Sequence, residues 1–154
     1  MTGHRGLHPA TEALIGSAVR DFLSSRAPDL VAVCWLADGT DQPITREILA
    51  AGGQLEAVVP AERYRDGLPS EAHRQYDTLL ARAIAAHRLP FVDSTSEAHM
   101  RASEHMLDLA DELLAIWDGK PAGGYGGTAD VVAAARERGV TVHIIWPPGA
   151  KRDA

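Results

Sequence analysis

The chain has 154 residues and a formal net charge of −6 at pH 7; 45% of its residues are hydrophobic and 23% are charged. This balance is typical of one globular domain with a single core, and one cysteine, Cys34, excludes a disulfide framework and a cysteine-based metal cluster. The negative charge argues against binding of a nucleic acid polymer. No apolar run approaches the roughly 20 residues that span a membrane. We therefore expect a cytoplasmic protein that binds neither a nucleic acid polymer nor a membrane.

Helical periodicity and short apolar runs alternate along the first half of the chain. Thr11 is placed to cap a helix whose apolar stripe runs to Leu23 and which ends near residue 27. The elements expected next are a strand over 30–36, a helix over 41–51 and a strand over 55–59. The first of these strands is apolar throughout, which is typical of a parallel strand covered on both faces.

The second half continues this alternation. Its expected elements are a helix over 70–87, a strand at 91–92, a helix over 96–109, a strand over 113–117, a helix over 129–138 and a strand over 140–146. Strands separated by helices of this length are joined by right-handed crossovers. We therefore predict an α/β fold in which residues 1–148 form a single doubly wound, mostly parallel Rossmann-like sheet with helices on both faces. Residues 149–154 are expected to form a flexible tail.

A glycine-rich loop precedes the last predicted helix. Gly123, Gly124, Gly126 and Gly127 have no Cβ, so the backbone can bring its N–H groups close to a bound oxyanion. Thr128, which we assign as the N-cap, opens a helix whose unpaired amides and dipole add to this attraction. The alternative is a plain flexible turn, but a connector does not require so many glycines. The loop therefore predicts a cradle for a phosphate-bearing small molecule.

Three loops, 2–7, 37–41 and 118–128, combine glycine with polar or charged side chains. In a doubly wound sheet, ligands bind outside the carboxyl ends of the strands, where the strand order reverses. We expect the three loops to meet there and form one ligand site. Its candidate ligand-binding residues are Gly3, His4, Arg5, Gly39, Thr40, Asp41, Asp118, Gly119, Gly123, Gly124, Tyr125, Gly126, Gly127 and Thr128.

Four motifs occur in order along nearly the whole chain: residues 2–7 (TGHRGL), 36–42 (LADGTDQ), 58–60 (VVP), and 117–119 (WDG) followed by 126–130 (GGTAD). Together they resemble the SLOG superfamily of Rossmann-like domains, which includes the LOG-type cytokinin-activating phosphoribohydrolases, the DNA-processing DprA proteins and many nucleotide-sensing modules. The resemblance implies a pocket for a nucleotide or nucleotide-derived ligand. These domains usually open with a strand before Gly-His-Arg, whereas this chain offers Met1 and Thr2 there.

The last loop departs from the LOG pattern. In LOG enzymes it reads Pro-Gly-Gly-x-Gly-Thr-x-x-Glu, and the glutamate assists cleavage of the N-glycosidic bond. Here Gly127 and Thr128 match the Gly-Thr pair, but Val131 occupies the glutamate's position. Asp130 is the nearby carboxylate, and a shift of one residue turns a side chain by about 100° on a helix. The resemblance therefore leaves hydrolysis open, with Asp118 and Asp130 as the catalytic candidates.

Several of these residues have two interpretations that the sequence leaves open. Arg5 is suited to grip a phosphate or to form a surface salt bridge. Asp41 is suited to cap the helix that follows it or to accept hydrogen bonds from a ribose or base. Tyr125 is suited to stack on a base or to cover the pocket. Core or pocket-wall positions are expected for the tryptophans, Trp35, Trp117 and Trp146.

Other ligand classes are excluded by spacing. His4 and His8 are four residues apart, but Gly6 and Pro9 disfavour the helix that would bring them together, so no metal site is expected. A dinucleotide fingerprint belongs to the first strand–helix unit, whereas this glycine loop precedes the last strand. No Gly-Lys-Ser/Thr follows the glycines, as a Walker A loop would require. We expect no NAD chemistry, no ATP hydrolysis and no cofactor.

These observations favour binding or sensing of a nucleotide or nucleotide-derived small molecule. The alternative is an enzyme of the phosphoribohydrolase or nucleoside deoxyribosyltransferase kind, with Asp118 or Asp130 acting at the anomeric carbon. A protein-interaction subunit is a third hypothesis. Several helices have broad apolar faces, and the related enzymes commonly form homodimers, so we also expect a homodimer.

Overall fold

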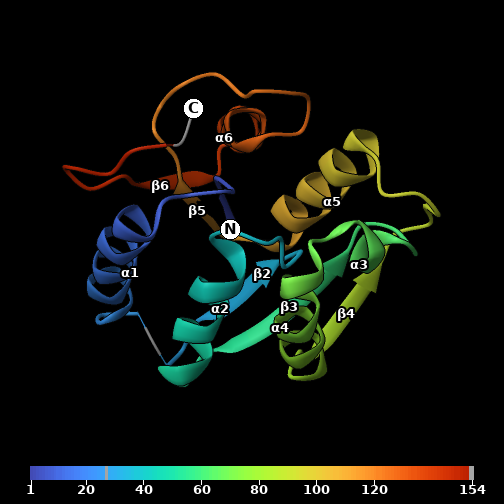
Figure 1. Ribbon diagram of the computed structural model, residues 1–154, viewed down its shortest axis with the longest axis horizontal. Helices are drawn as coiled ribbons and strands as arrows, with labels where there is room; N and C mark the ends of the chain where they lie inside the picture. The colour runs from blue at the N-terminus through green and yellow to red at the C-terminus, as the bar shows by residue number, and fades with distance from the viewer. Residues whose placement is uncertain (27, 153–154) are drawn as a thin grey trace.

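The computed structural model describes residues 1–26 and 28–152, in which helices and strands alternate (Figure 1). The strands are β1 (Thr2–Gly3), β2 (Val31–Cys34), β3 (Gln54–Val59), β4 (Ala85–Arg88), β5 (Glu112–Ile116) and β6 (Thr141–Ile145). The helices are α1 (Pro9–Leu23), α2 (Asp41–Ala50), α3 (Tyr64–Gly67), α4 (Ser70–Ala81), α5 (Ser96–Leu109) and α6 (Thr128–Glu137).

The strands pair in parallel, and their order reverses beside β1. Hydrogen-bonded ladders join β1, β5 and β6 in one three-stranded sheet and β2, β3 and β4 in another, with β5 and β3 central. The two sheets adjoin at β1 and β2, where the α-amino group of Met1 donates to the Val33 carbonyl at 2.8 Å. The predicted α/β class is confirmed, although its backbone pairing is divided between two sheets rather than continuous.

Helices cover both faces of the strands. Helix α2 packs between α1 and α4, while α5 packs against α6, and these two groups lie on opposite sides of the strands (Figure 1). The core between the layers is apolar, with fully buried Val19 from α1, Leu55 from β3, Met106 from α5 and Ile116 from β5. This doubly covered arrangement explains the consecutive apolar residues at 31–34 in β2 and 113–116 in β5.

The boundary between α4 and β4 differs from the prediction. The expected helix to residue 87 ends at Ala81, and residues 85–88 form β4 instead of a strand at 91–92. Apolar residues at helical spacing continue to Ile84, but the Ile84 amide donates to the Leu55 carbonyl at 2.8 Å and starts the pairing of β4 with β3. Tertiary pairing therefore overrides the local periodicity.

Two predicted helix caps are also corrected. Helix α1 begins at Pro9, because proline is favoured in the first turn of a helix. Its N-cap is His8, whose side chain accepts a hydrogen bond from the Ala10 amide. Thr11 lies inside that helix and is buried. Helix α6 begins at Thr128 itself, with Gly127 as its N-cap and no capping bond from a side chain. The expected end of the first helix, at residue 27, lies outside the described residues.

The segment predicted to be a flexible tail packs against the start of the chain over its described part. The Thr11 hydroxyl donates to the Lys151 carbonyl and accepts from the Lys151 amide, both at 3.0 Å. Leu7 and Arg152 form an antiparallel bridge. Residues 153–154 of the predicted tail lie outside the described residues. Among the helices of the described chain, none has the length and apolar character needed to cross a membrane.

Candidate functional site

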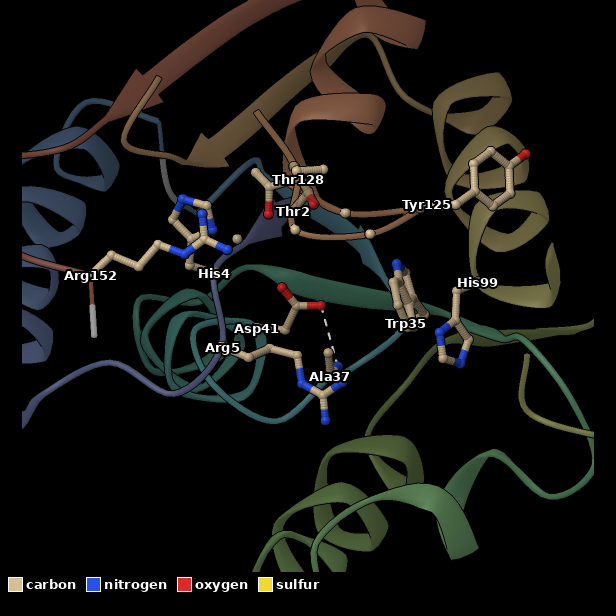
Figure 2. A pocket seen from close by; sticks show the side chains of 16 residues that line it. Thr2, His4, Arg5, Trp35, Ala37, Asp41, His99, Tyr125, Thr128 and Arg152 are labelled. Carbon is tan, nitrogen blue, oxygen red and sulfur yellow. Dashed lines mark hydrogen bonds between the residues drawn. The ribbon is translucent and has the colours of Figure 1, made fainter. Parts of the chain in front are cut away.

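A cavity of about 320 Å³ opens beyond the carboxyl ends of β1 and β2, next to the loop that leads into α6 (Figure 2). Strand β1 has β5 on one side and β2 near the other, so the cavity lies where the strand order reverses. This is the expected place for a ligand in a doubly wound fold.

The cavity gathers most of the predicted ligand-binding residues. Those that line it are Gly3, His4, Arg5, Asp41, Gly123, Gly124, Tyr125, Gly126, Gly127 and Thr128. The other lining residues are Thr2, Trp35, Ala37, His99, Ala122 and Arg152. Of these, the sequence analysis had placed Trp35 in the core or a pocket wall and Arg152 in the tail. His99 was not singled out, because a histidine on an amphipathic helix carries no local sign of a site.

Four predicted residues, Gly39, Thr40, Asp118 and Gly119, do not line the cavity. Thr40 instead holds two of its loops together, because its hydroxyl donates to the His4 carbonyl at 3.4 Å. A Cβ on Gly3 would lie 2.0 Å from the Thr40 hydroxyl oxygen, so the close approach requires glycine. Gly39 and Thr40 therefore act behind the wall of the cavity.

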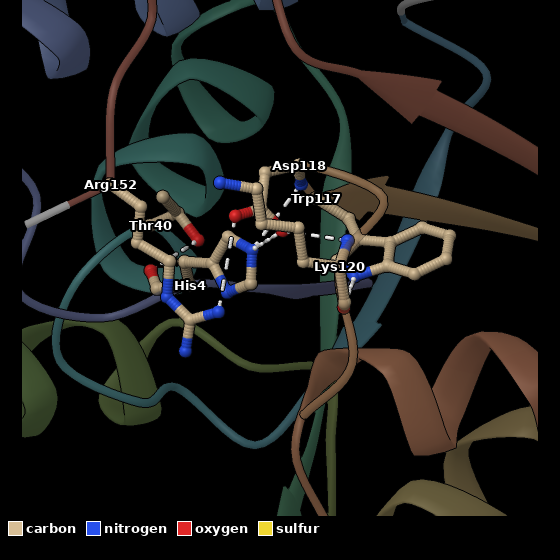
Figure 3. A network of polar contacts seen from close by, with 6 residues as sticks. All are labelled: His4, Thr40, Trp117, Asp118, Lys120 and Arg152. Atoms are coloured by element: carbon tan, nitrogen blue, oxygen red, sulfur yellow. Dashed lines mark hydrogen bonds and ion pairs between the residues drawn. The ribbon is translucent and has the colours of Figure 1, made fainter. Parts of the chain in front are cut away.

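Asp118 joins His4 directly behind the cavity (Figure 3). His4 Nε2 lies 3.0 Å from Asp118 Oδ1 and 3.3 Å from the Asp118 amide nitrogen, while Oδ1 also accepts from the Lys120 amide at 3.0 Å. An ionised carboxylate can only accept, so the shorter contact places the proton on Nε2, and the amide contact is then not a hydrogen bond. This pair ties the ends of β1 and β5 together.

The pKa values of this pair fix its charge state. Burial alone would raise the pKa of Asp118, but the Lys120 amide, His4 and the charge of Arg152 lower it overall. Burial lowers the pKa of His4, and its hydrogen bond to Asp118 opposes that effect without reversing it. At neutral pH, Asp118 is therefore an anion and His4 is neutral.

Two arginines reach the cavity from opposite ends of the chain. Arg5 forms an ion pair with Asp38, and about half of its side chain is exposed. Arg152 Nη1 lies 3.9 Å from Asp118 Oδ2, and a Cβ on Gly123 would lie 3.7 Å from Arg152 Nη2. Since Oδ2 is buried with no hydrogen-bond partner in the described chain, the guanidinium of Arg152 lies between a loosely paired carboxylate and the glycine loop.

The predicted cradle of glycine amides is partly closed by internal hydrogen bonds. The Gly126 amide donates to Asp130 Oδ2 at 2.8 Å, and the Gly127 amide donates to the Gly124 carbonyl at 3.3 Å. This corrects the expectation that these two amides are open to an oxyanion. Within the described residues, the amides of Thr128 and Ala129 have no hydrogen-bond partner, so the open donors belong to the first turn of α6.

Asp41 is the carboxylate that lines the cavity. It is the first residue of α2, it is 3% exposed, and its Oδ2 accepts from the Ala37 amide at 3.3 Å. Figure 2 shows one carboxylate oxygen directed to Ala37 and the other directed into the cavity. Burial raises the pKa of Asp41 to about 6, against the opposing effects of the Met1 α-amino group, the Ala37 amide and Arg5. Asp41 was expected to cap the helix that follows it, but its carboxylate instead bonds back to Ala37 and holds the 37–41 loop closed.

The aromatic wall of the cavity comes from Trp35 and His99 rather than from Tyr125. The rings of Trp35 and His99 lie 4.9 Å apart between centroids and are tilted by 34°. Tyr125 lies at the rim, is 65% exposed, and directs its ring away from the other two (Figure 2). Asp130 lies outside the lining, and the described residues contain no cluster of three or more histidine, cysteine or acidic side chains suited to a metal ion.

No protein-family model matches this sequence, and no curated protein matches it. Among solved structures, a weak similarity is found to (E)-4-hydroxy-3-methyl-but-2-enyl diphosphate reductase, described as the terminal enzyme of the non-mevalonate pathway. The match has 13% sequence identity and a TM-score of 0.27, and it covers 94% of this chain and 58% of the reductase chain. A similarity this weak carries no argument about fold or function, so the interpretation of the site depends on its own geometry.

Proposed function

We propose that the cavity binds a nucleotide or nucleotide-derived small molecule, with the phosphate end against the start of α6. The observation that carries the proposal is the convergence of Arg152, the start of α6 at Thr128 with its open amide, and an aromatic wall in one cavity where the strand order reverses. The motifs that resemble the SLOG superfamily support the same class of ligand.

The first turn of α6 and Arg152 supply complementary donors. Unpaired amides at a helix N-terminus attract an anion through their N–H groups and the helix dipole. The guanidinium of Arg152 adds further donors in a planar fork that suits a phosphate. Because Asp118 Oδ2 is 3.9 Å away, Arg152 can approach a phosphate without breaking a close ion pair.

The internal bonds of Gly126 and Gly127 give the glycine loop a different role from a pure amide cradle. They hold the loop in one shape beside the cavity, and the ligand anion is left to the helix start and the arginine. A preformed loop reduces the entropy that is lost on binding. This supports recognition by a fixed site.

Isothermal titration calorimetry with AMP, ADP-ribose and inorganic phosphate tests the proposal. We expect binding of at least one nucleotide, and a loss of about tenfold or more in the Arg152→Ala variant, the size expected for a charge-assisted hydrogen bond. Arg63→Ala is the matched control, because Arg63 is exposed and pairs with Asp93 away from the cavity. No binding of these probes at millimolar concentration would contradict the proposal, and a stable protein partner in pull-downs would then favour an interaction subunit.

A second candidate function is cleavage of an N-glycosidic bond, and the position of Asp41 favours it. Asp118 is engaged by His4, and Asp130 by Gly126, whereas Asp41 lines the cavity with a pKa of about 6. A carboxyl group with such a pKa can exchange a proton near neutral pH. Release of free base from AMP, lost in Asp41→Asn, supports this candidate; AMP that binds but stays intact contradicts it for this substrate.

We also propose that the protein is a homodimer, as the apolar helix faces predict. Exposed apolar side chains at Val31, Ile84 and Leu109, which line one hollow at the amino ends of the strands, support this assembly. Sedimentation velocity at micromolar concentration tests it, and a single monomeric species would overturn it.

A further inference from the structure

Trp35 lies in the wall of the cavity and packs against other aromatic rings. It directly follows β2, and His99 of α5 lies against it with ring centroids 4.9 Å apart. Figure 2 shows the indole nearly edge-on, with His99 on one side and the cavity on the other. Tyr64 packs against both rings, with centroids 5.6 Å from Trp35 and 5.8 Å from His99. The indole is therefore fixed by two aromatic rings while it borders the cavity.

The indole nitrogen of Trp35 is an unsatisfied donor. The side chain is only 9% exposed, and Nε1 is buried with no hydrogen-bond partner in the described part of the chain. A buried indole N–H usually has a partner, because losing water without replacing its hydrogen bond is unfavourable. In Figure 2, this nitrogen is the part of Trp35 nearest to the glycine loop, where the proposed phosphate site lies.

The backbone next to Trp35 is also unusual. Leu36 has a φ of +55°, the left-handed region that residues with a Cβ rarely adopt. Its carbonyl accepts a hydrogen bond from the Gln42 side chain at 3.2 Å, which holds the turn in place. Strain of this kind is maintained where the surrounding structure fixes it, and it gathers at ligand sites. Here it accompanies the turn of the chain directly after Trp35.

We infer that the part of the Trp35 indole that borders the cavity, with His99 packed against it, is the subsite for the planar base of the ligand. The inference depends on the proposed function, because it divides the same cavity into a base end at Trp35 and a phosphate end at α6. A neutral or weakly polar aromatic heterocycle stacks on an indole regardless of its ring substituents. The base of the proposed nucleotide is therefore recognised through its face, and the phosphate through Arg152 and α6.

The two parts of the indole contribute unequally. The indole ring borders the cavity, whereas Nε1 is buried with no hydrogen-bond partner in the described part of the chain. We therefore expect stacking on the ring to contribute more to binding of the base than a hydrogen bond from the N–H. Trp35→Phe keeps an aromatic face and removes the N–H, whereas Trp35→Leu removes both.

Titrations with AMP and with ribose 5-phosphate, which has no base, separate this subsite from the phosphate site. We expect Trp35→Leu to weaken AMP binding by about tenfold or more, in the range measured for base–aromatic stacking, and to leave ribose 5-phosphate binding unchanged. Trp35→Phe should weaken AMP binding by less than about fivefold, the small loss expected for a neutral hydrogen bond. Trp117→Phe is the matched control, because the Trp117 indole donates to the Lys120 carbonyl and does not line the cavity.

A spectroscopic measurement on the unmodified protein covers the case in which these variants do not fold. The indole N–H resonance of Trp35, assigned by its absence from Trp35→Phe or by elimination with Trp117→Phe and Trp146→Phe, should shift with AMP and not with ribose 5-phosphate. If AMP binds by calorimetry and this resonance stays fixed, or if Trp35→Leu binds AMP as tightly as the parent, the base subsite is wrong while the proposed function stands. If neither probe binds, both fall together.

Discussion

Asp41 is a buried carboxylate with no cation in contact with it among the described residues. Removal from water raises the pKa of Asp41 to about 6, because the nearby charge of the Met1 α-amino group and the hydrogen bond from the Ala37 amide offset only part of this cost. The folded protein therefore holds a proton on Asp41 at pH values where the unfolded chain has lost it. The contribution of Asp41 to folding stability therefore falls as the pH rises from about 4 to about 6, and above this range the full cost of burying the charge remains.

We predict that Asp41→Asn stabilises the protein at pH 7.5. The asparagine carbonyl can still accept from the Ala37 amide, and the cost of the buried charge disappears. The difference between the folded and ordinary pKa values corresponds to a gain of at most about 3 kcal/mol in the free energy of unfolding. Urea denaturation at pH 7.5 and at pH 4 measures it.

The comparison of variant and parent at the two pH values separates the effect of Asp41 on stability from the effect of the buried histidines. His4 and His99 both have lowered pKa values because of burial, so they change stability in the opposite direction, but they do so in both proteins. The advantage of Asp41→Asn should shrink toward zero at pH 4. An advantage that is the same at both pH values would mean that charge burial is not its cause.

At the scale of elements, the loop before α6 is shaped by a side chain of the helix itself. Asp130 reaches back from the first turn to the Gly126 amide at 2.8 Å, and Gly126 has a φ of +85° with the Ser96 carbonyl 3.2 Å from where a Cβ would lie. The loop thus passes close to the start of α5 in a conformation that favours glycine. Asp130 acts here as a tether of the loop.

We predict that Asp130→Asn retains nucleotide binding and stability, because the amide oxygen of asparagine still accepts from Gly126. Asp130→Ala removes the acceptor and should cost about 1 to 2 kcal/mol, the range for loss of a carboxylate bond to helix-start amides. Thermal denaturation and calorimetry with AMP measure both effects. A catalytic Asp130 would behave differently: Asp130→Asn would then keep the fold but abolish release of free base.

Helix α5, whose start is marked by a local cap, was predicted well, whereas strand β4, which is fixed by a distant partner, was not. Helix α5 starts where Thr95 accepts from the Ala98 amide and spans the predicted residues 96–109. Strand β4 has no such mark, because it is defined by pairing with β3. The Asp130 tether did have a local sign, a carboxylate four residues after a glycine at a helix start.

The same distinction applies to the site. Glycine and polar residues that follow strands identified the correct edge of the fold. Which of them face the cavity depends on packing between loops, so Asp118 and Thr40 were assigned to the lining although they lie behind it. Arg152 was assigned to a tail because its position depends on contacts with residues near the other end of the chain.

At the scale of the whole molecule, residues from both ends of the described chain line the cavity. Residues 2–5 line the cavity, and the segment after β6 returns to the start of the chain, where Arg152 forms a bridge with Leu7 and also lines the cavity. Thr11 fixes that segment by exchanging two hydrogen bonds with Lys151 across 140 positions of the sequence. Folding and completion of the site are therefore coupled through this contact.

We predict that deletion of residues 149–154 lowers both the melting temperature and the affinity for AMP, whereas Arg152→Ala lowers affinity alone. Thr11→Val, which keeps the shape of the side chain but leaves the backbone groups of Lys151 without their partner, should lower the free energy of unfolding by about 1 to 3 kcal/mol. It should also weaken AMP binding less than Arg152→Ala does, because the guanidinium is still present but held less firmly. Differential scanning calorimetry and titration on the three variants separate anchoring from recognition. A deletion variant that melts and binds like the parent would show that the terminal segment is dispensable and that the anion is held by α6 without it.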